Sequence, residues 1–101
     1  MAADIYVSAL LDVYGPILSD KQFRILDGYY NNDLSLSEIA ENEGITRQGV
    51  SDFVRRTEAQ LYELEDKLHI YKTLSSIKNT ATLIKSGQNN VDDLLTLIDN
   101  L

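Results

Sequence analysis

The chain has 101 residues, of which 44% are hydrophobic and 25% are charged, and its formal net charge is −7. This composition is typical of a folded globular protein, with one domain expected over residues 1–101, and the absence of cysteine excludes disulfides and cysteine-type zinc sites. No uncharged apolar run approaches the ~20 residues of a membrane-spanning helix, so we expect a cytoplasmic protein with no membrane insertion.

Helical periodicity extends through most of the chain, and no window alternates like a strand. We therefore predict an all-α fold, a helical bundle. A first helix is expected from Asp4 to about Tyr14, because Gly15-Pro16 would end it. The residues expected to share its apolar face are Ile5, Leu10, Val13 and Tyr14.

Two capping boxes predict the next two helix starts. Ser19 with Gln22 begins a second helix, whose expected apolar set is Phe23, Leu26, Tyr29 and Tyr30. Ser35 with Glu38 begins a short third helix. Gly44 follows this helix at the place where one residue with a positive φ commonly ends it.

Thr46 is a good N-cap for a long fourth helix. Its apolar residues alternate at spacings of four and three, as in a heptad seam: Val50, Val54, Thr57, Leu61, Leu64, Leu68 and Tyr71. This seam can mediate self-association or pack inside the same chain, and we predict a homodimer. After Thr73, weaker periodicity and a last helix capped by Asn90 form a C-terminal helical extension, residues 74–101.

Residues 36–57 have the pattern of a helix-turn-helix, in which two helices are joined by a short turn that contains glycine. The second helix of such a unit can enter the major groove of DNA. Small residues are needed where the two helices cross, and apolar residues must fill the interface. The residues expected in these structural positions are Ile39, Ala40, Gly44, Ile45, Val50 and Phe53.

The fourth helix also carries the positive charge of the chain. Residues 45–57 contain three arginines and one aspartate, a net charge of +2, whereas residues 1–44 carry −6 and residues 58–101 carry −3. We predict a surface that binds nucleic acid, with DNA favoured over RNA, formed by Thr46, Arg47, Gln48, Ser51, Asp52, Arg55 and Arg56. The alternative is a solvated helix face without a ligand.

Several runs carry a resemblance to a known family: Leu11-Asp12-Val13-Tyr14-Gly15-Pro16, Ser35-Leu36-Ser37-Glu38-Ile39-Ala40 and Arg47-Gln48-Gly49-Val50-Ser51-Asp52. Together with their flanks, over about residues 5–72, they resemble the YlxM family of small bacterial helix-turn-helix proteins. The resemblance implies a fold similar to region 4 of sigma factors, transcription regulation, and a link to the signal recognition particle pathway. Glu43 departs from the apolar residue usual before the turn glycine, and Gly49 stands where the family often has alanine.

The remaining polar residues do not suggest catalysis. The sequence has no nucleophile–base pair, metal-ligand cluster or glycine-rich phosphate loop, so we expect no enzyme activity, no cofactor and no metal site. The charge run formed by Glu63, Glu65 and Asp66 is expected to face solvent. The acidic net charge favours a second hypothesis, an adaptor (or RNA binder) that binds a protein or RNA component of the secretion-targeting machinery.

Overall fold

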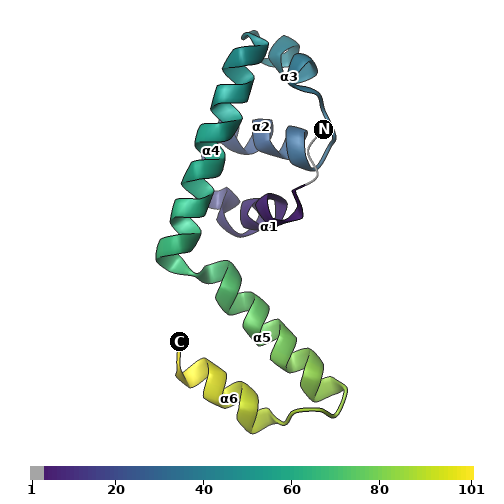
Figure 1. Ribbon diagram of the computed structural model, residues 1–101, viewed down its shortest axis with the longest axis vertical. Helices are drawn as coiled ribbons and strands as arrows, with labels where there is room; N and C mark the ends of the chain where they lie inside the picture. Colours follow the sequence, from purple (N-terminus) through teal and green to yellow (C-terminus); the bar gives the residue numbers. More distant parts are fainter. Residues whose placement is uncertain (1–3) are drawn as a thin grey trace. The chain divides into compact units, whose positions relative to one another are not determined.

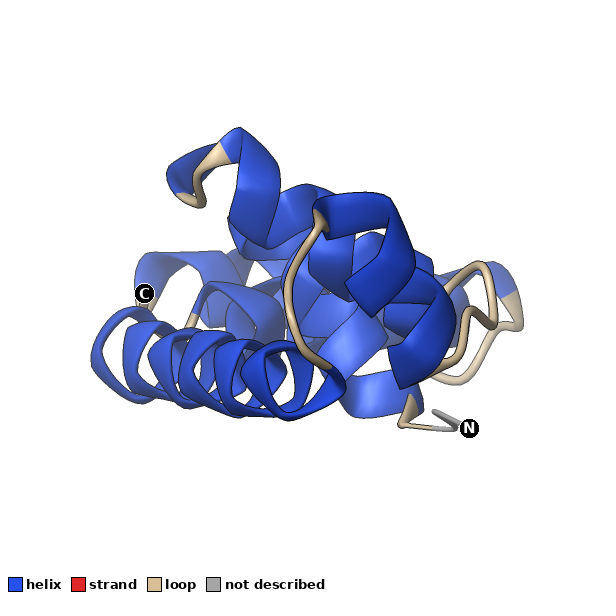
Figure 2. Ribbon diagram, turned by 90° about the horizontal axis from the view of Figure 1, so that it is seen from above, coloured by secondary structure: helices blue, strands red, loops and turns tan. Residues whose placement is uncertain are grey.

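The computed structural model describes residues 4–101, which contain six α-helices, one 3-10 helix and no strand (Figures 1 and 2). The bounds are α1 Ile5–Tyr14, η1 Gly15–Ile17, α2 Asp20–Tyr30, α3 Leu36–Glu43, α4 Arg47–Leu68, α5 Ile70–Lys85 and α6 Val91–Asp99. The predicted all-α fold is confirmed. The helices form two compact units, an N-terminal unit that ends at Leu68 and a C-terminal unit, His69–Leu101. The assignment of a single domain stays a prediction.

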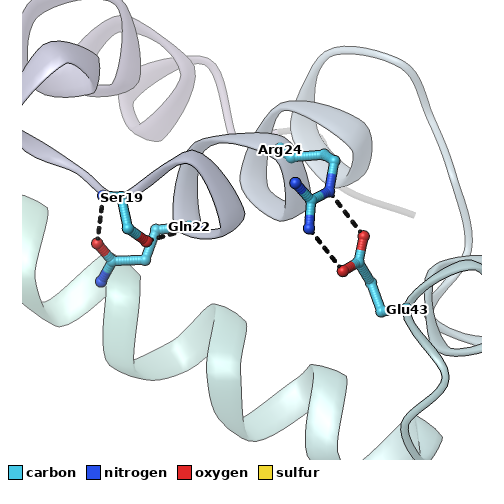
Figure 3. Close-up of polar contacts among 4 residues, drawn as sticks. All are labelled: Ser19, Gln22, Arg24 and Glu43. Atoms are coloured by element: carbon cyan, nitrogen blue, oxygen red, sulfur yellow. Dashed lines mark hydrogen bonds and ion pairs between the residues drawn. The ribbon is translucent and has the colours of Figure 1, made fainter.

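Side-chain caps begin five of the six α-helices, and four of the five are caps that the sequence predicts. In each case a side-chain oxygen accepts a hydrogen bond from the backbone N–H three residues later. The capping residues are Asp4, Ser19, Ser35, Thr46 and Asn90. Three of these caps are complete capping boxes, and Figure 3 shows the one formed by Ser19 and Gln22.

The core of the N-terminal unit lies where α1, α2 and α3 pack along one side of α4 (Figure 1). Burying these apolar side chains stabilises the fold by roughly 1.5–3 kcal/mol for each large residue. The fully buried large side chains are Val7, Leu10, Leu11, Tyr14, Ile25, Leu26, Val50 and Leu61. The first half of the predicted seam of α4 is therefore used inside the chain.

Two predicted apolar faces are partly wrong. Ile5 is 84% exposed, and Val7 and Leu11 are buried in α1 instead. In α2, Ile25 is buried whereas Phe23 is 40% exposed. The reason is that the Phe23 ring lies over the turn after α1, where a Cβ atom on Gly15 would stand 2.9 Å from it.

The predicted seam of α4 is also wrong beyond Leu68, because Tyr71 lies on α5. Helix α4 ends at Leu68 because His69 adopts a left-handed backbone conformation with φ 53°. The Leu68 side chain is 50% exposed. Glu65, expected in solvent, is 7% exposed and buried. Its Oε1 atom accepts a hydrogen bond of 2.6 Å from the Tyr14 hydroxyl, a contact that joins α4 to α1.

The C-terminal unit consists of α5 and α6, which pack against each other. Helix α6 begins at the predicted cap, Asn90, with Asp92 and Asp93 in its first turn. Neither helix contains a buried residue. No helix within residues 4–101 is long and apolar enough to span a membrane.

Candidate nucleic-acid interface

Helices α3 and α4 are joined by a turn of three residues, 44–46. Gly44 has φ 69°, a conformation in which most other residues are strained. The Gly44 and Ile45 N–H groups both donate to the carbonyl oxygen of Ala40, which closes the end of α3. The predicted helix-turn-helix geometry is therefore present.

The structural residues predicted for this motif hold the two helices together to different extents. Ile39, Ala40 and Val50 are buried. Ile45 and Phe53 are only partly covered, so they line the edge of the core.

Gly49 leaves room for the cap of α4. A Cβ atom at this position would lie 3.1 Å from Thr46 Oγ1, the atom that accepts the Gly49 N–H hydrogen bond at 3.0 Å. Glycine costs helix stability relative to alanine, about 0.5–1 kcal/mol. Here that cost is offset in part, because the absence of a Cβ atom leaves the Thr46 cap uncrowded.

Glu43 does not shorten α3 or loosen its packing, because it has a partner on α2. Arg24 donates two hydrogen bonds of 2.8 Å to the two carboxylate oxygens of Glu43 (Figure 3). The hydrogen bonds to Arg24 hold the pKa of the Glu43 carboxyl below its ordinary value, and the same pair raises the pKa of Arg24. The pair fixes the last turn of α3 against α2, directly before the turn into α4.

The polar side chains of α4 lie opposite its buried face. Val50, Val54, Thr57 and Leu61 face the core. Gln48, Arg55 and Arg56 are exposed on the other side, and Asp52 is partly exposed between them. With Ala59, the residues Asp52, Arg55 and Arg56 line a shallow depression on this surface.

Three of these side chains form one hydrogen-bonded network. Gln48 Nε2 donates to Asp52 Oδ1 at 3.0 Å, and the Arg55 guanidinium forms an ion pair with the same oxygen atom. We name Gln48, Asp52 and Arg55 the α4 triad. The triad places two potential base-reading groups beside one arginine on the exposed side of α4.

The other predicted site residues surround the α4 triad. Thr46, Arg47 and Arg56 are exposed. Ser51 is only partly exposed, because it lines a groove with Tyr29, Tyr30 and Leu36. The structure therefore leaves Thr46, Arg47, Gln48, Arg55 and Arg56 exposed and Asp52 partly exposed, and it places Ser51 in a neighbouring groove.

Lys21 is a basic residue beside α4 that sequence reasoning missed. Its Nζ atom lies 5.4 Å from the centre of the Phe53 ring, in the geometry of a cation–π contact. This contact places a positive charge beside Phe53 of α4. No local pattern could have revealed it, because Lys21 is on α2 and the two residues meet only in the folded chain.

Comparison with known proteins agrees with this geometry. A model of the family described as UPF0122, "Putative helix-turn-helix protein, YlxM / p13 like", matches residues 1–101. The UPF0122 protein of Fusobacterium nucleatum is 37% identical over 97 residues, covering 96% of this chain and 93% of the relative. The chain belongs to the YlxM / p13-like family.

Other members of the YlxM / p13-like family are similar over shorter stretches. The UPF0122 protein of Acetivibrio thermocellus is 45% identical over 89 residues, covering 87% of this chain and 76% of the relative. That of Clostridium kluyveri is 45% identical over 78 residues, covering 77% of this chain and 70% of the relative. The resemblance found in the sequence is confirmed, and the family match extends it from about residues 5–72 to the whole chain.

Proposed function

We propose that this chain binds DNA through the N-terminal half of α4 and acts in the cytoplasm as a non-catalytic regulator of transcription. The observation that carries the proposal is the exposed surface of α4, which presents Arg47, Arg55 and Arg56 in the one segment with positive net charge. The membership of a helix-turn-helix family supports the same function.

The geometry of α4 suits the major groove. A helix with its side chains is about 10–12 Å wide, and the groove is about 12 Å wide. Because α1, α2 and α3 all pack on one side of α4, the opposite side is accessible. In the proposed complex, Gln48 contacts base edges with Asp52 beside it in the groove, while Arg47, Arg55 and Arg56 contact phosphates.

The proposed binding is weak and sensitive to salt. Three arginines provide few phosphate contacts, and each contact contributes roughly one unit to the dependence of log affinity on log salt concentration. Within the α4 triad, Asp52 holds Arg55 and repels phosphates. We therefore propose a homodimer, because two copies on two half-sites double the phosphate contacts.

The test is fluorescence anisotropy of the purified protein with a labelled DNA duplex and a labelled structured RNA, at about 50 and 200 mM salt. The variant Arg47→Ala, Arg55→Ala removes two arginines of the surface. The matched control is Lys67→Ala, Lys72→Ala, which removes two exposed cations elsewhere.

We expect the arginine variant to bind duplex DNA at least about tenfold more weakly at the lower salt concentration, and the control to bind like the wild type. An equal loss of affinity in the control variant would mean that the effect comes from the change in net charge alone. Absence of DNA binding by the wild type at low salt would contradict the proposal, and tighter binding to the RNA would reverse the preference for DNA.

A second candidate is an adaptor that uses a different surface. Tyr6 of α1 and Tyr62 of α4 stack with ring centres 6.1 Å apart beside Ile5, which is 84% exposed. Burial and the nearby carboxylates of Asp4 and Glu58 raise the pKa of Tyr62. An aromatic surface with carboxylates favours a basic partner, such as a protein of the signal recognition particle.

The two candidates predict different sensitive residues. If the chain is an adaptor, Ile5→Ser with Tyr62→Ser should weaken binding to the purified signal recognition particle protein in calorimetry, and the arginine variant should bind normally. If this surface is only structural, neither variant binds the particle protein differently from the wild type.

A further inference from the structure

The C-terminal unit exposes apolar side chains that its two helices do not cover. No residue of α5 or α6 is buried. The exposed fractions are 53% for Leu74, 52% for Leu95 and 42% for Ile98. Leu94 and Leu97, on another side of α6, are half-buried.

These residues form a continuous stripe on each helix. On α5 the apolar residues recur at spacings of three, four and three, which is the spacing of a helix–helix seam: Leu74, Ile77, Ala81 and Ile84. Of these, Leu74 and Ala81 are exposed, and Ile77 and Ile84 are half-buried. On α6 the exposed stripe is Val91, Leu95 and Ile98. We name these two stripes together the C-terminal seam.

A unit of this size needs further burial to be stable. Folded units below about 40 residues usually depend on disulfides, metals or association. This unit spans His69–Leu101, and the chain has no cysteine. Among residues 4–101 no cluster of His, Asp or Glu could hold a metal ion. Association with another copy would cover the C-terminal seam.

The charges beside the seam indicate which partner covers it. Lys78 and Lys85 are spaced seven residues apart on α5, and Asp92 and Asp99 are spaced seven apart on α6. On a helical wheel, each pair lies along one edge of its apolar stripe. Helix α5 contains no acidic residue, and α6 contains no basic residue.

These opposite charges do not pair with each other in the part of the chain that the structure describes. Among residues 4–101, no ion pair joins Lys78 or Lys85 to Asp92 or Asp99. In a dimer with two-fold symmetry, the lysines on α5 of each copy would lie beside the aspartates on α6 of the other copy. Such flanking charges select partner and orientation in helical assemblies.

We propose that the C-terminal seam is the surface through which two copies of this chain associate, with α5 of each copy packed against α6 of the other in a four-helix bundle. This inference rests on the homodimer proposed above, and it names the surface by which the two copies associate. The first half of the α4 seam is unavailable for this purpose, because Val50, Val54 and Leu61 are buried inside the N-terminal unit.

The test is a charge exchange in the full-length protein. Variant one carries Lys78→Glu and Lys85→Glu, so that both of its helices are acidic. Variant two carries Asp92→Lys and Asp99→Lys, so that both are basic. Each variant alone repels its own copies, whereas a mixture restores opposite charges at both contacts.

Molar mass is measured by light scattering over a dilution series from about 50 μM downward, so that the dissociation constant of each protein is obtained. We expect a wild-type dimer, a dissociation constant raised at least about tenfold in each variant alone, and a dimer in the mixture. Circular dichroism of each variant checks that helix content is retained, and Asp12→Lys and Lys67→Glu serve as charge controls in the N-terminal unit.

The outcomes separate the surface from the homodimer. A wild-type monomer would overturn both. A wild-type dimer whose dissociation constant is unchanged in both single variants would overturn the C-terminal seam and leave the homodimer standing. Variants that are monomeric alone and stay monomeric when mixed would show that the charges act within one chain, which also overturns the seam as an interface.

Discussion

At the scale of single residues, the Tyr14–Glu65 contact is a buried polar link between α1 and α4. We expect Tyr14→Phe to lower the free energy of unfolding by about 1–3 kcal/mol, because it removes a donor from a buried carboxylate. Urea denaturation measures this change. Tyr29→Phe, which alters a half-exposed ring, is the matched control and should change stability little. Equal effects of the two substitutions would contradict the role given to the hydrogen bond.

The Arg24–Glu43 pair predicts a pH dependence with a definite sign. Because the pKa of Glu43 is lowered from 4.5, its contribution to stability is fully present above 4.5 and is lost as the pH falls through the lowered pKa. We expect Glu43→Gln to be less stable than the wild type at about pH 7, and the difference to disappear at low pH. Urea denaturation over a pH series measures it. A difference that is constant with pH would be inconsistent with the ion pair.

Asp52 has a testable role in the α4 triad. It holds Arg55 and adds negative charge to the proposed DNA surface. We expect Asp52→Asn to strengthen DNA binding by up to about fivefold, because an exposed ion pair holds its arginine by less than about 1 kcal/mol. Anisotropy titration measures the change. Weaker binding by this variant would mean instead that the carboxylate itself contacts a base, as cytosine allows.

At the scale of elements, the turn between α3 and α4 depends on Gly44. We expect Gly44→Ala to destabilise the N-terminal unit by about 1 kcal/mol, because a Cβ atom is strained at this positive φ. Gly44→Asn should cost less, since asparagine tolerates the left-handed conformation. Thermal unfolding of the two variants compares them. Equal stability of Gly44→Ala and the wild type would refute the account of the turn.

The element boundaries that could be predicted depend on local chemistry. Ser19, Ser35, Thr46 and Asn90 were all predictable caps, because each acts on a backbone N–H group three residues away. The positive φ of Gly44 follows from its place after a helix. The helix-turn-helix was predictable for the same reason: its parts are consecutive in the chain.

The features that could not be predicted depend on distant residues. The burial of Glu65 requires Tyr14, which lies on another helix. The Arg24–Glu43 pair and the Lys21–Phe53 contact likewise join separate elements. Spacing along one helix cannot reveal such partners. The same limit explains the wrong extension of the α4 seam, which the left-handed backbone at His69 interrupts.

At the scale of the whole molecule, the proposals assign different tasks to the two compact units. The N-terminal unit presents α4 and carries 6 basic and 13 acidic residues, a net charge of −7. The C-terminal unit carries 3 of each sign, separated onto α5 and α6. Net repulsion of nucleic acid by the N-terminal unit would restrict binding to the local positive surface of α4.

The most direct test of DNA binding by α4 is the salt dependence of its affinity for duplex DNA, measured by anisotropy in the wild type and in Arg47→Ala, Arg55→Ala. Each arginine that contacts a phosphate contributes about 0.9 to the slope of log affinity against log salt concentration. We predict that the slope becomes shallower by about 2 per chain in the variant. Identical slopes in the two proteins would contradict the assignment of α4 as the DNA-binding helix.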